Sequence, residues 1–327
     1  MQGTNFDFEK PIAELEAMIA SLKSVEGRSK AAAEGIDIDT AVEPLELELH
    51  RVMEKVYGNL SAWEKTQMAR HKDRPYSLDY IRLIFDDFFE LHGDRLAAND
   101  EAIVGGLAKL NGQPVVVIGQ QKGRDLKERQ RRNFGSARAE GFRKALRIAR
   151  LAEKFRVPLF TFVDTAGAAA DLRAEEHGVS EAIARNLMEF SLLRIPVIVT
   201  VIGEGGSGGA LGVAVGDRVL MLEHSVYSVI SPEGCAAILW RDKAMANEAA
   251  DALKLTAQYA HQLNLVDEIL PEPLGGAHRN VTDMALTLKE ALVRHLNELS
   301  GSGETTLVDG RYSRLRSMGV FQEKVSR

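Results

Sequence analysis

The chain has 327 residues, of which 45% are hydrophobic and 27% charged, a composition typical of globular proteins. No apolar run approaches the roughly 18 residues of a membrane span, and residues 1–10 lack a signal-peptide pattern, so we expect a cytoplasmic protein without membrane contact. The net charge of −6 argues against general nucleic-acid affinity, and the single cysteine, Cys235, excludes an internal disulfide and a multi-cysteine zinc site.

Two narrow apolar stripes predict a helical extension over residues 1–75. The stripes repeat at alternating spacings of three and four, first at Ile12, Leu15, Ile19 and Leu22, then at Val42, Leu45, Leu49, Val52 and Val56. Residues 27–39 are rich in Ala, Gly, Ser and Lys and are expected to connect the two helices. The pattern predicts a helical hairpin, and two hypotheses stay open: it packs on a partner chain, or both helices cover the main domain of their own chain.

An α/β domain is expected over residues 76–300. Its first two strands are joined by Asn111-Gly112, a strong hairpin signal, and Ser231-Pro232 has the capping residue and first-position proline of a helix start. The expected elements are strands at 103–110, 114–119, 159–163, 197–202, 219–222 and 227–230, and helices at 140–155, 179–193, 209–215, 247–263 and 282–299. Residues 301–327 form a polar tail that we expect to be loosely held.

The strand at 197–202 ends in the glycine run, residues 203–209 (GEGGSGG). Three functional hypotheses compete for it. Gly203, Gly205 and Gly208 fit a dinucleotide fingerprint with Glu223 as its ribose-binding acid. Gly205-x-Ser207-x-Gly209 fits the nucleophile elbow of a hydrolase, for which His224, His261 and His278 are available. The third hypothesis uses only backbone: glycines let two amides approach an oxygen on which negative charge develops. A glycine turn without any ligand is the structural alternative.

Several motifs resemble those of the bacterial acetyl-CoA carboxylase carboxyltransferase alpha subunits. The resemblance runs from about residue 6 to residue 316, almost the whole chain. The motifs that carry it are residues 201–210 (VIGEGGSGGA), 227–235 (YSVISPEGC), 271–279 (PEPLGGAHR), 74–80 (RPYSLDY), 121–124 (QKGR) and 180–187 (SEAIARNL).

The resemblance implies a crotonase-type (ClpP/crotonase-like) α/β fold, a spiral of β-β-α units. It implies a transferase that moves a carboxyl group from carboxybiotin on a carrier protein to acetyl-CoA, giving malonyl-CoA for fatty acid synthesis. It also implies an α2β2 heterotetramer active only with the beta subunit, which carries the zinc, and further partners in the biotin carboxyl carrier protein and the ATP-binding biotin carboxylase. No covalently bound cofactor or metal is expected on this chain.

For the site, the resemblance places the biotin side of the reaction at the glycine run. We expect Gly208 and Gly209 to supply the amide donors, with Gly205 and Gly206 shaping the loop and Ala166 and Gly167 lining it. Loss of CO2 from carboxybiotin leaves negative charge on the ureido oxygen, which preorganised amides stabilise without a nucleophile.

Residues 122–156 are strongly basic, with thirteen Lys or Arg against four acids, a local balance of +9. One hypothesis is a polyanion site for the phosphates of coenzyme A, with Lys122, Arg124 and Arg132 nearest the motifs. Nucleic acid is the second candidate partner, supported by this segment alone. The structural alternative is a solvated helix face that also contacts an acidic partner subunit.

The sequence departs from its family in two loops. Members usually carry Asp-Thr-Pro-Gly-Ala-Tyr-Pro-Gly where residues 164–171 read DTAGAAAD, and Met-Pro-x-Pro-Glu-Gly where residues 136–141 read SARAEG. Asp171 is expected to place a negative charge near a site for anions. Two hypotheses follow: a weakened homologue kept for assembly with the beta subunit, or an active second copy whose altered loop, Ala166 to Asp171, is insensitive to an inhibitor.

Overall fold

The computed structural model describes residues 6–33 and 37–319. In that part of the chain, eight strands form one mixed sheet in the order β1-β2-β3-β4-β5-β6-β8, and β7 pairs with β5. The strands are β1 (Asp86–Glu90), β2 (Ile103–Leu110), β3 (Gln113–Gln120), β4 (Leu159–Thr165), β5 (Val197–Gly206), β6 (Arg218–Leu222), β7 (Val226–Ser228) and β8 (Glu268–Leu270). The predicted α/β class is confirmed.

The sheet is antiparallel at one edge and parallel through its centre. β1, β2 and β3 pair antiparallel, and every pairing from β3 through β8 is parallel. β2 and β3 form the hairpin predicted from Asn111-Gly112, both of which have positive φ. Since β3, β4 and β5 run in the same direction, their carboxyl ends lie together at one edge of the sheet.

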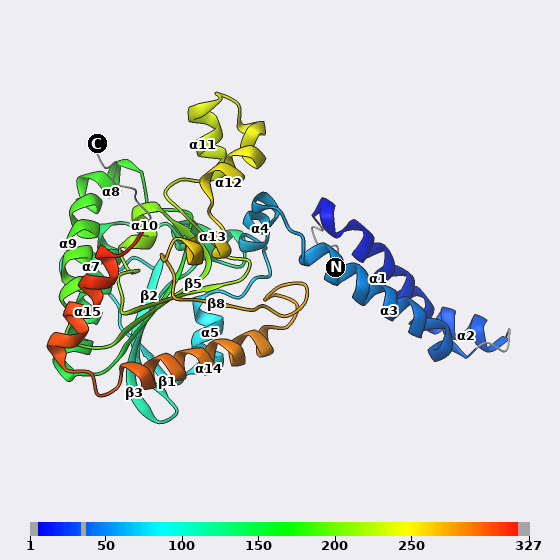
Figure 1. The fold of residues 1–327 in the computed structure, drawn as a ribbon, viewed down its shortest axis with the longest axis horizontal. Coiled ribbons are helices and arrows are strands. Elements are labelled where there is room, and N and C mark those ends of the chain that lie inside the picture. Colours follow the sequence, from blue (N-terminus) through cyan, green and yellow to red (C-terminus); the bar gives the residue numbers. More distant parts are fainter. Residues whose placement is uncertain (1–5, 34–36, 320–327) are drawn as a thin grey trace, which may run out of the picture.

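Helices cover both faces of this sheet (Figure 1). The longer helices are α1 (Lys10–Lys23), α2 (Val25–Ala33), α3 (Ile38–Tyr57), α4 (Ala62–Ala69), α5 (Ser77–Ile84), α7 (Ala139–Phe155), α9 (Val179–Leu192), α11 (Pro232–Leu239), α12 (Ala246–Leu253), α14 (Val281–Leu299) and α15 (Glu304–Arg316). The short helices are α6 (Leu126–Arg131), α8 (Leu172–Glu176), α10 (Ser207–Leu211) and α13 (Ala257–Gln262).

Alternate residues of the central strands face two hydrophobic cores. On one face, Val116 and Ile118 pack with α7 and α9 through Phe142 and Phe190. On the other, Val117 packs with α5 and α14. β4 is buried along its whole length because helices cover both of its faces.

The N-terminal hairpin is confirmed in part. α1 and α3 pack against each other, and the hairpin projects from the body (Figure 1), so the hypothesis that both helices cover the main domain is wrong. Its base is held by Ile12, Tyr57 and Met68. Residues 25–33 of the expected connector form α2, while residues 34–36 lie outside the described part. α4, also in the predicted extension, packs on the body beside Val226 and Leu255.

Three other expectations need correction. The helix expected at 247–263 is two helices, α12 and α13, because Lys254 turns into a left-handed conformation with φ of 50°. The tail is not loosely held throughout, since residues 304–316 form α15 and bury Arg311. Finally, β5 continues through the glycine run to Gly206, so α10 begins at Ser207 rather than Gly209.

Candidate functional site

The carboxyl ends of β3, β4 and β5 each present a buried polar side chain. Gln120 donates from Nε2 to the Gly209 carbonyl at 2.6 Å and accepts the Asp164 amide at its Oε1 at 3.1 Å. Asp164 Oδ1 in turn accepts the Glu204 amide at 3.0 Å. These hydrogen bonds fix the glycine run at both ends, since Glu204 lies near its start and Gly209 is its last residue.

The glycines of the run permit close backbone approach to the loop that follows β4. A Cβ on Gly206 would lie 2.2 Å from the Ala166 carbonyl oxygen, and one on Gly209 would lie 2.4 Å from the Ala168 nitrogen. A Cβ on Gly203 would lie 2.4 Å from Asp164 Oδ1. The altered loop therefore packs closely against the glycine run, with Ala166 and Gly167 in contact range of Gly206 and Gly209.

Gly208 differs from Gly206 and Gly209 because a Cβ there would make only ordinary contacts and no clash. The atom nearest to a Cβ there is Ile183 Cδ1 at 3.7 Å, an ordinary contact. Ser207, just before it, has a φ of 48°, a strained conformation for a residue with a side chain. The turn at Ser207 starts α10, and the first amides of a helix have no partner within it. That the amides of Gly208 and Gly209 donate to an external oxygen stays a prediction.

A charge network with a buried centre includes Glu204 of the glycine run. Lys122 Nζ contacts Asp164 Oδ1 at 2.7 Å and Glu204 Oε2 at 2.8 Å. Arg70 contacts Glu204 Oε1 at 2.6 Å and Glu233 Oε1 at 2.5 Å. Although burial alone would raise it, the charges of Lys122 and Arg70 hold the pKa of Glu204 at about 2. Burial alone would lower the pKa of Lys122, but Asp164 and Glu204 raise it above its ordinary value.

Two small cavities flank this network. One has a volume of about 20 Å³ and is lined by residues that include Ala166, Gly205 and Gly206. Ser231 and Pro232, at the start of α11, also line it. The other, of about 160 Å³, is lined by residues that include the cations Arg70, Lys122 and Arg129 and the aromatic side chains Tyr76 and Phe134. Glu204 and Arg70 line both, so the network forms the wall between them.

The three predicted phosphate ligands are not brought together as a free cationic surface. Lys122 is committed to Asp164 and Glu204. Arg124 lies over the Tyr76 ring and pairs with Asp79, with 41% of its side chain exposed. Arg132 is buried, pairs with Glu128 and donates to the Glu101 carbonyl. That these residues bind phosphate stays a prediction.

The negative charge expected from Asp171 is compensated within the chain. Asp171 Oδ2 accepts Arg138 Nη2 at 2.7 Å and Nε at 3.1 Å, and its Oδ1 caps α8 at the Ala174 amide. The Arg138 side chain lowers the pKa of Asp171 further below its ordinary value. The repulsion expected at this loop is thereby reduced.

The alternative motif hypotheses gain no support from this geometry. Ser207 has the strained conformation of an elbow, but in the described chain its hydroxyl makes no hydrogen bond to a histidine. His278 stacks instead on His71. Glu223, the proposed ribose ligand, accepts the Glu272 amide.

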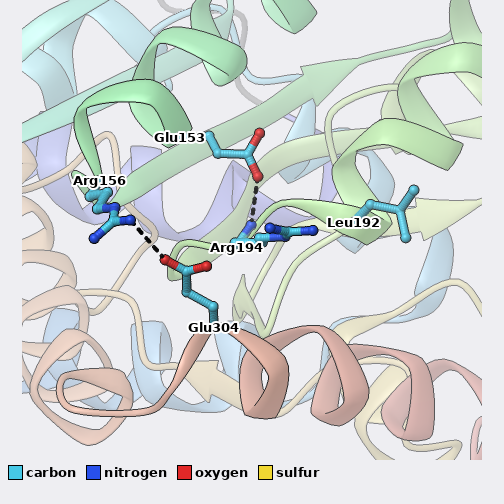
Figure 2. A pocket seen from close by; sticks show the side chains of 5 residues that line it. All are labelled: Glu153, Arg156, Leu192, Arg194 and Glu304. Carbon is cyan, nitrogen blue, oxygen red and sulfur yellow. Dashed lines mark hydrogen bonds and ion pairs between the residues drawn. The ribbon is translucent and has the colours of Figure 1, made fainter.

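A larger hollow of about 350 Å³ lies away from these residues, between α7, α9 and α15 (Figure 2). In it, Arg156 pairs with Glu304, and Glu153 accepts the backbone amide of Arg194. None of the predicted site residues lines it, so its size alone does not make it the site.

Four residues that hold or contact the glycine run were not singled out from the sequence as functional: Gln120, Asp164, Glu204 and Arg70. The first three are polar residues where buried parallel strands end, and that position is itself a signal of a binding site. Arg70 gave no such signal. In the described residues no cluster of three or more His, Cys, Asp or Glu could hold a metal ion. Nor does that part of the chain contain a helix suited to crossing a membrane.

Comparison with known proteins now adds to this geometry. Residues 5–319 match a family model described as acetyl co-enzyme A carboxylase carboxyltransferase-like. Proteins named acetyl-coenzyme A carboxylase carboxyl transferase subunit alpha are similar throughout: that of Geobacter metallireducens is 55% identical over 97% of this chain and 98% of the relative. The protein of Halorhodospira halophila is 54% identical over 97% of this chain and 98% of the relative. The protein of Bordetella pertussis is also 54% identical, over 99% of both chains.

Solved structures agree in fold. A transcarboxylase 12S structure with methylmalonyl-coenzyme A bound superposes with a TM-score of 0.56 at 20% identity, over 68% of this chain and 41% of that one. The Pseudomonas malonate decarboxylase MdcD-MdcE heterodimer gives 0.53 at 20% identity, over 66% of this chain and 88% of that one. These likenesses confirm the predicted crotonase-like fold.

Proposed function

The chain belongs to the family of acetyl-CoA carboxylase carboxyltransferase alpha subunits, and on this premise we propose that it forms the carboxybiotin half of a shared active site. In the proposed reaction, a carboxyl group passes from biotin on the carrier protein to acetyl-CoA and yields malonyl-CoA. The chain would act in the cytoplasm, where its buried thiol, Cys235, stays reduced.

One observation carries the assignment of the site: α10 begins at the strained Ser207, and at Gly208 a Cβ would lie no closer than 3.7 Å to any other side chain. When the carboxyl group leaves, negative charge grows on the ureido oxygen. The amides of Gly208 and Gly209 would donate to that oxygen, and their positions are fixed before the reaction. Removing one such donor typically costs about 3 kcal/mol in the transition state.

The neighbouring residues have supporting roles in this proposal. Gly205 and Gly206 shape the run, and Gly206 leaves room for the Ala166 carbonyl. Ala166 and Gly167 form the opposing wall. No catalytic base is required from this chain, since the biotin nitrogen freed of its carboxyl group can accept the proton from the acetyl methyl group.

Within the basic segment, residues 122–156, Arg124 is the residue that we expect to bind the phosphates of coenzyme A. Of the three candidates it has the most exposed side chain, at 41%, against 14% for Lys122 and 9% for Arg132. Neutralising an exposed arginine that binds phosphate removes a charge-assisted hydrogen bond. Nucleic acid, the other polyanion considered, has no support beyond the charge of this segment.

A beta subunit would supply the acetyl-CoA half of the site and the zinc, in an α2β2 complex. The biotin carboxyl carrier protein would deliver the substrate, and biotin carboxylase would charge it. Malonyl-CoA formation should therefore require both subunits. The test is to assay this chain alone, a beta subunit alone and the co-purified complex with free carboxybiotin and acetyl-CoA. Activity in the chain alone would contradict the shared site.

The alternative of a homologue that only assembles is not favoured. It arose from the altered loop, yet that loop packs against Gly206 and Gly209, and the charge of Asp171 is paired with Arg138. Whether the loop also confers insensitivity to an inhibitor is part of the proposal, to be read from the same assay with and without inhibitor.

A further inference from the structure

The ion pairs of Lys122 suggest a function for a charge to which the proposed reaction assigns no direct part. Lys122 Nζ lies within 2.8 Å of both Asp164 and Glu204, and 14% of its side chain is exposed. Both carboxylates are buried, with side-chain exposures of 2% and 10%. Two buried carboxylates that share one cation would repel each other strongly if that cation were removed.

Asp164 also fixes backbone of the site, and Glu204 connects that backbone to a neighbouring helix. Asp164 accepts the Glu204 amide at 3.0 Å, and Gly203 has no side chain that would prevent this approach. Glu204 is itself a member of the glycine run. Its side chain reaches Arg70, which contacts Glu233 in the first turn of α11. One chain of ion pairs thus joins β4, the glycine run, α4 and α11.

We infer that Lys122 is a positioning residue: its ammonium group holds Asp164 and Glu204 together and thereby fixes the path of the glycine run. The inference rests on the proposed function, because it assigns Lys122 a part in the same site. The amide donors of a preorganised site lose efficiency when they move, and a displacement of about 1 Å can cost on the order of 10²-fold in rate.

The test compares Lys122→Met with a matched control, Arg143→Gln. Arg143 pairs with Asp94 at 2.9 Å and is similarly buried, with exposures of 19% and 1% for the two partners, but it joins α7 to the loop after β1. Both variants lose a partly buried cation and are expected to be less stable. Only Lys122→Met should lower kcat in the complex with the beta subunit, by on the order of 10²-fold, with the KM for acetyl-CoA unchanged.

A second readout does not depend on activity. Hydrogen exchange of the peptide covering residues 203–212, measured by mass spectrometry on the full complex, should be faster in Lys122→Met than in wild type and unchanged in Arg143→Gln. If wild type shows no carboxyl transfer, the proposed function fails, and the exchange comparison still tests the positioning role.

If Lys122→Met does not fold, Glu204→Gln and Lys122→Arg replace it, because each retains more of the network. Both should assemble and show a lower kcat, with Lys122→Arg closer to wild type since it keeps the charge. A folded, assembled Lys122 variant with wild-type kcat and wild-type exchange at residues 203–212 would overturn the inference.

Discussion

Arg138 and Asp171 form an ion pair, at 2.7 Å between Nη2 and Oδ2, that joins the two loops in which this sequence departs from the motifs of its family. A backbone hydrogen bond from the Ala169 amide to the Ala137 carbonyl, 2.9 Å long, joins the same loops. The two altered loops are therefore in direct contact. A charge that would be unfavourable in one loop is balanced by a charge in the other.

Removing either member of this pair should have little effect on stability, because exposed ion pairs contribute little. We expect Arg138→Gln, Asp171→Asn and the double variant to show equal, small decreases in melting temperature. The double variant should show no additional loss, since either single change already breaks the pair. Additive losses in the thermal melts would mean that the two residues act independently.

Gly208 and Gly209 should respond differently to an added side chain. Gly209→Ala brings a Cβ to 2.4 Å from the Ala168 nitrogen, so the backbone has to move, at a cost of about 1–3 kcal/mol in stability and most of the activity. Gly208→Val would bring its Cβ into ordinary contact with Ile183 and should assemble normally, yet lose carboxyl transfer because it adds a side chain beside the proposed amide donors. Melting curves and transfer rates on both variants separate the two effects. Normal transfer by Gly208→Val would place the substrate elsewhere.

Arg311 should be the residue on which α15 depends. It is fully buried, contacts both carboxylate oxygens of Asp217 and donates to the carbonyls of Phe190, Leu193 and Ile195. Arg311→Ala leaves a buried carboxylate unpaired, so we expect a loss of about 3–5 kcal/mol in urea unfolding. The exposed Arg316→Ala, on the same helix, should change stability by less than about 0.5 kcal/mol. If both variants lost the same small free energy of unfolding, the contacts of Arg311 would contribute nothing to stability.

The stacked pair His71 and His278 should make stability depend on pH. Their rings are 3.9 Å apart, and burial, followed by the charges of His71 and Arg279, lowers the pKa of His278 to about 3. A histidine with a lowered folded pKa binds its proton more readily in the unfolded chain. The stability that comes from keeping this histidine neutral is therefore fully present above about pH 6.5. As the pH falls below that value, the free energy of unfolding decreases by up to about 1.4 kcal/mol per pH unit for each proton.

The check is to measure unfolding between pH 5 and pH 7.5. His278→Gln should reduce the slope below about pH 6.5, whereas His50→Gln, on the exposed face of α3, should leave it as in wild type. An unchanged slope in His278→Gln would show that His278 does not cause the pH dependence of stability.

Local signals were sufficient for much of the fold. The cap at Ser231, whose hydroxyl accepts the Gly234 amide, and the hairpin at Asn111-Gly112 were predictable because they depend on neighbouring residues. β1 and β8 were missed: one is five residues long and largely exposed, and the other has three residues and no apolar alternation. α15 was missed because Arg311 holds it with hydrogen bonds rather than with an apolar stripe.

The part of the candidate site that depends on backbone geometry, the glycine run, could be predicted from the sequence. The part that depends on ion pairs between residues distant in sequence could not. A run with so many glycines indicates close backbone approach, and that approach is present at Gly206 and Gly209. The environment of Lys122 gave no local signal, since its partner Glu204 is 82 residues away in sequence. A count of charges along the sequence therefore makes Lys122 look available to phosphate, although it is paired with two carboxylates. Asp171 was read as unpaired for the same reason, because Arg138 lies 33 residues before it.

The most direct test of the account is the rate of malonyl-CoA formation by the complex of this chain with a beta subunit, supplied with free carboxybiotin and acetyl-CoA. We expect carboxyl transfer that requires both subunits and that is lost in Gly208→Val while the complex stays assembled. An assembled wild-type complex that forms no malonyl-CoA would contradict it.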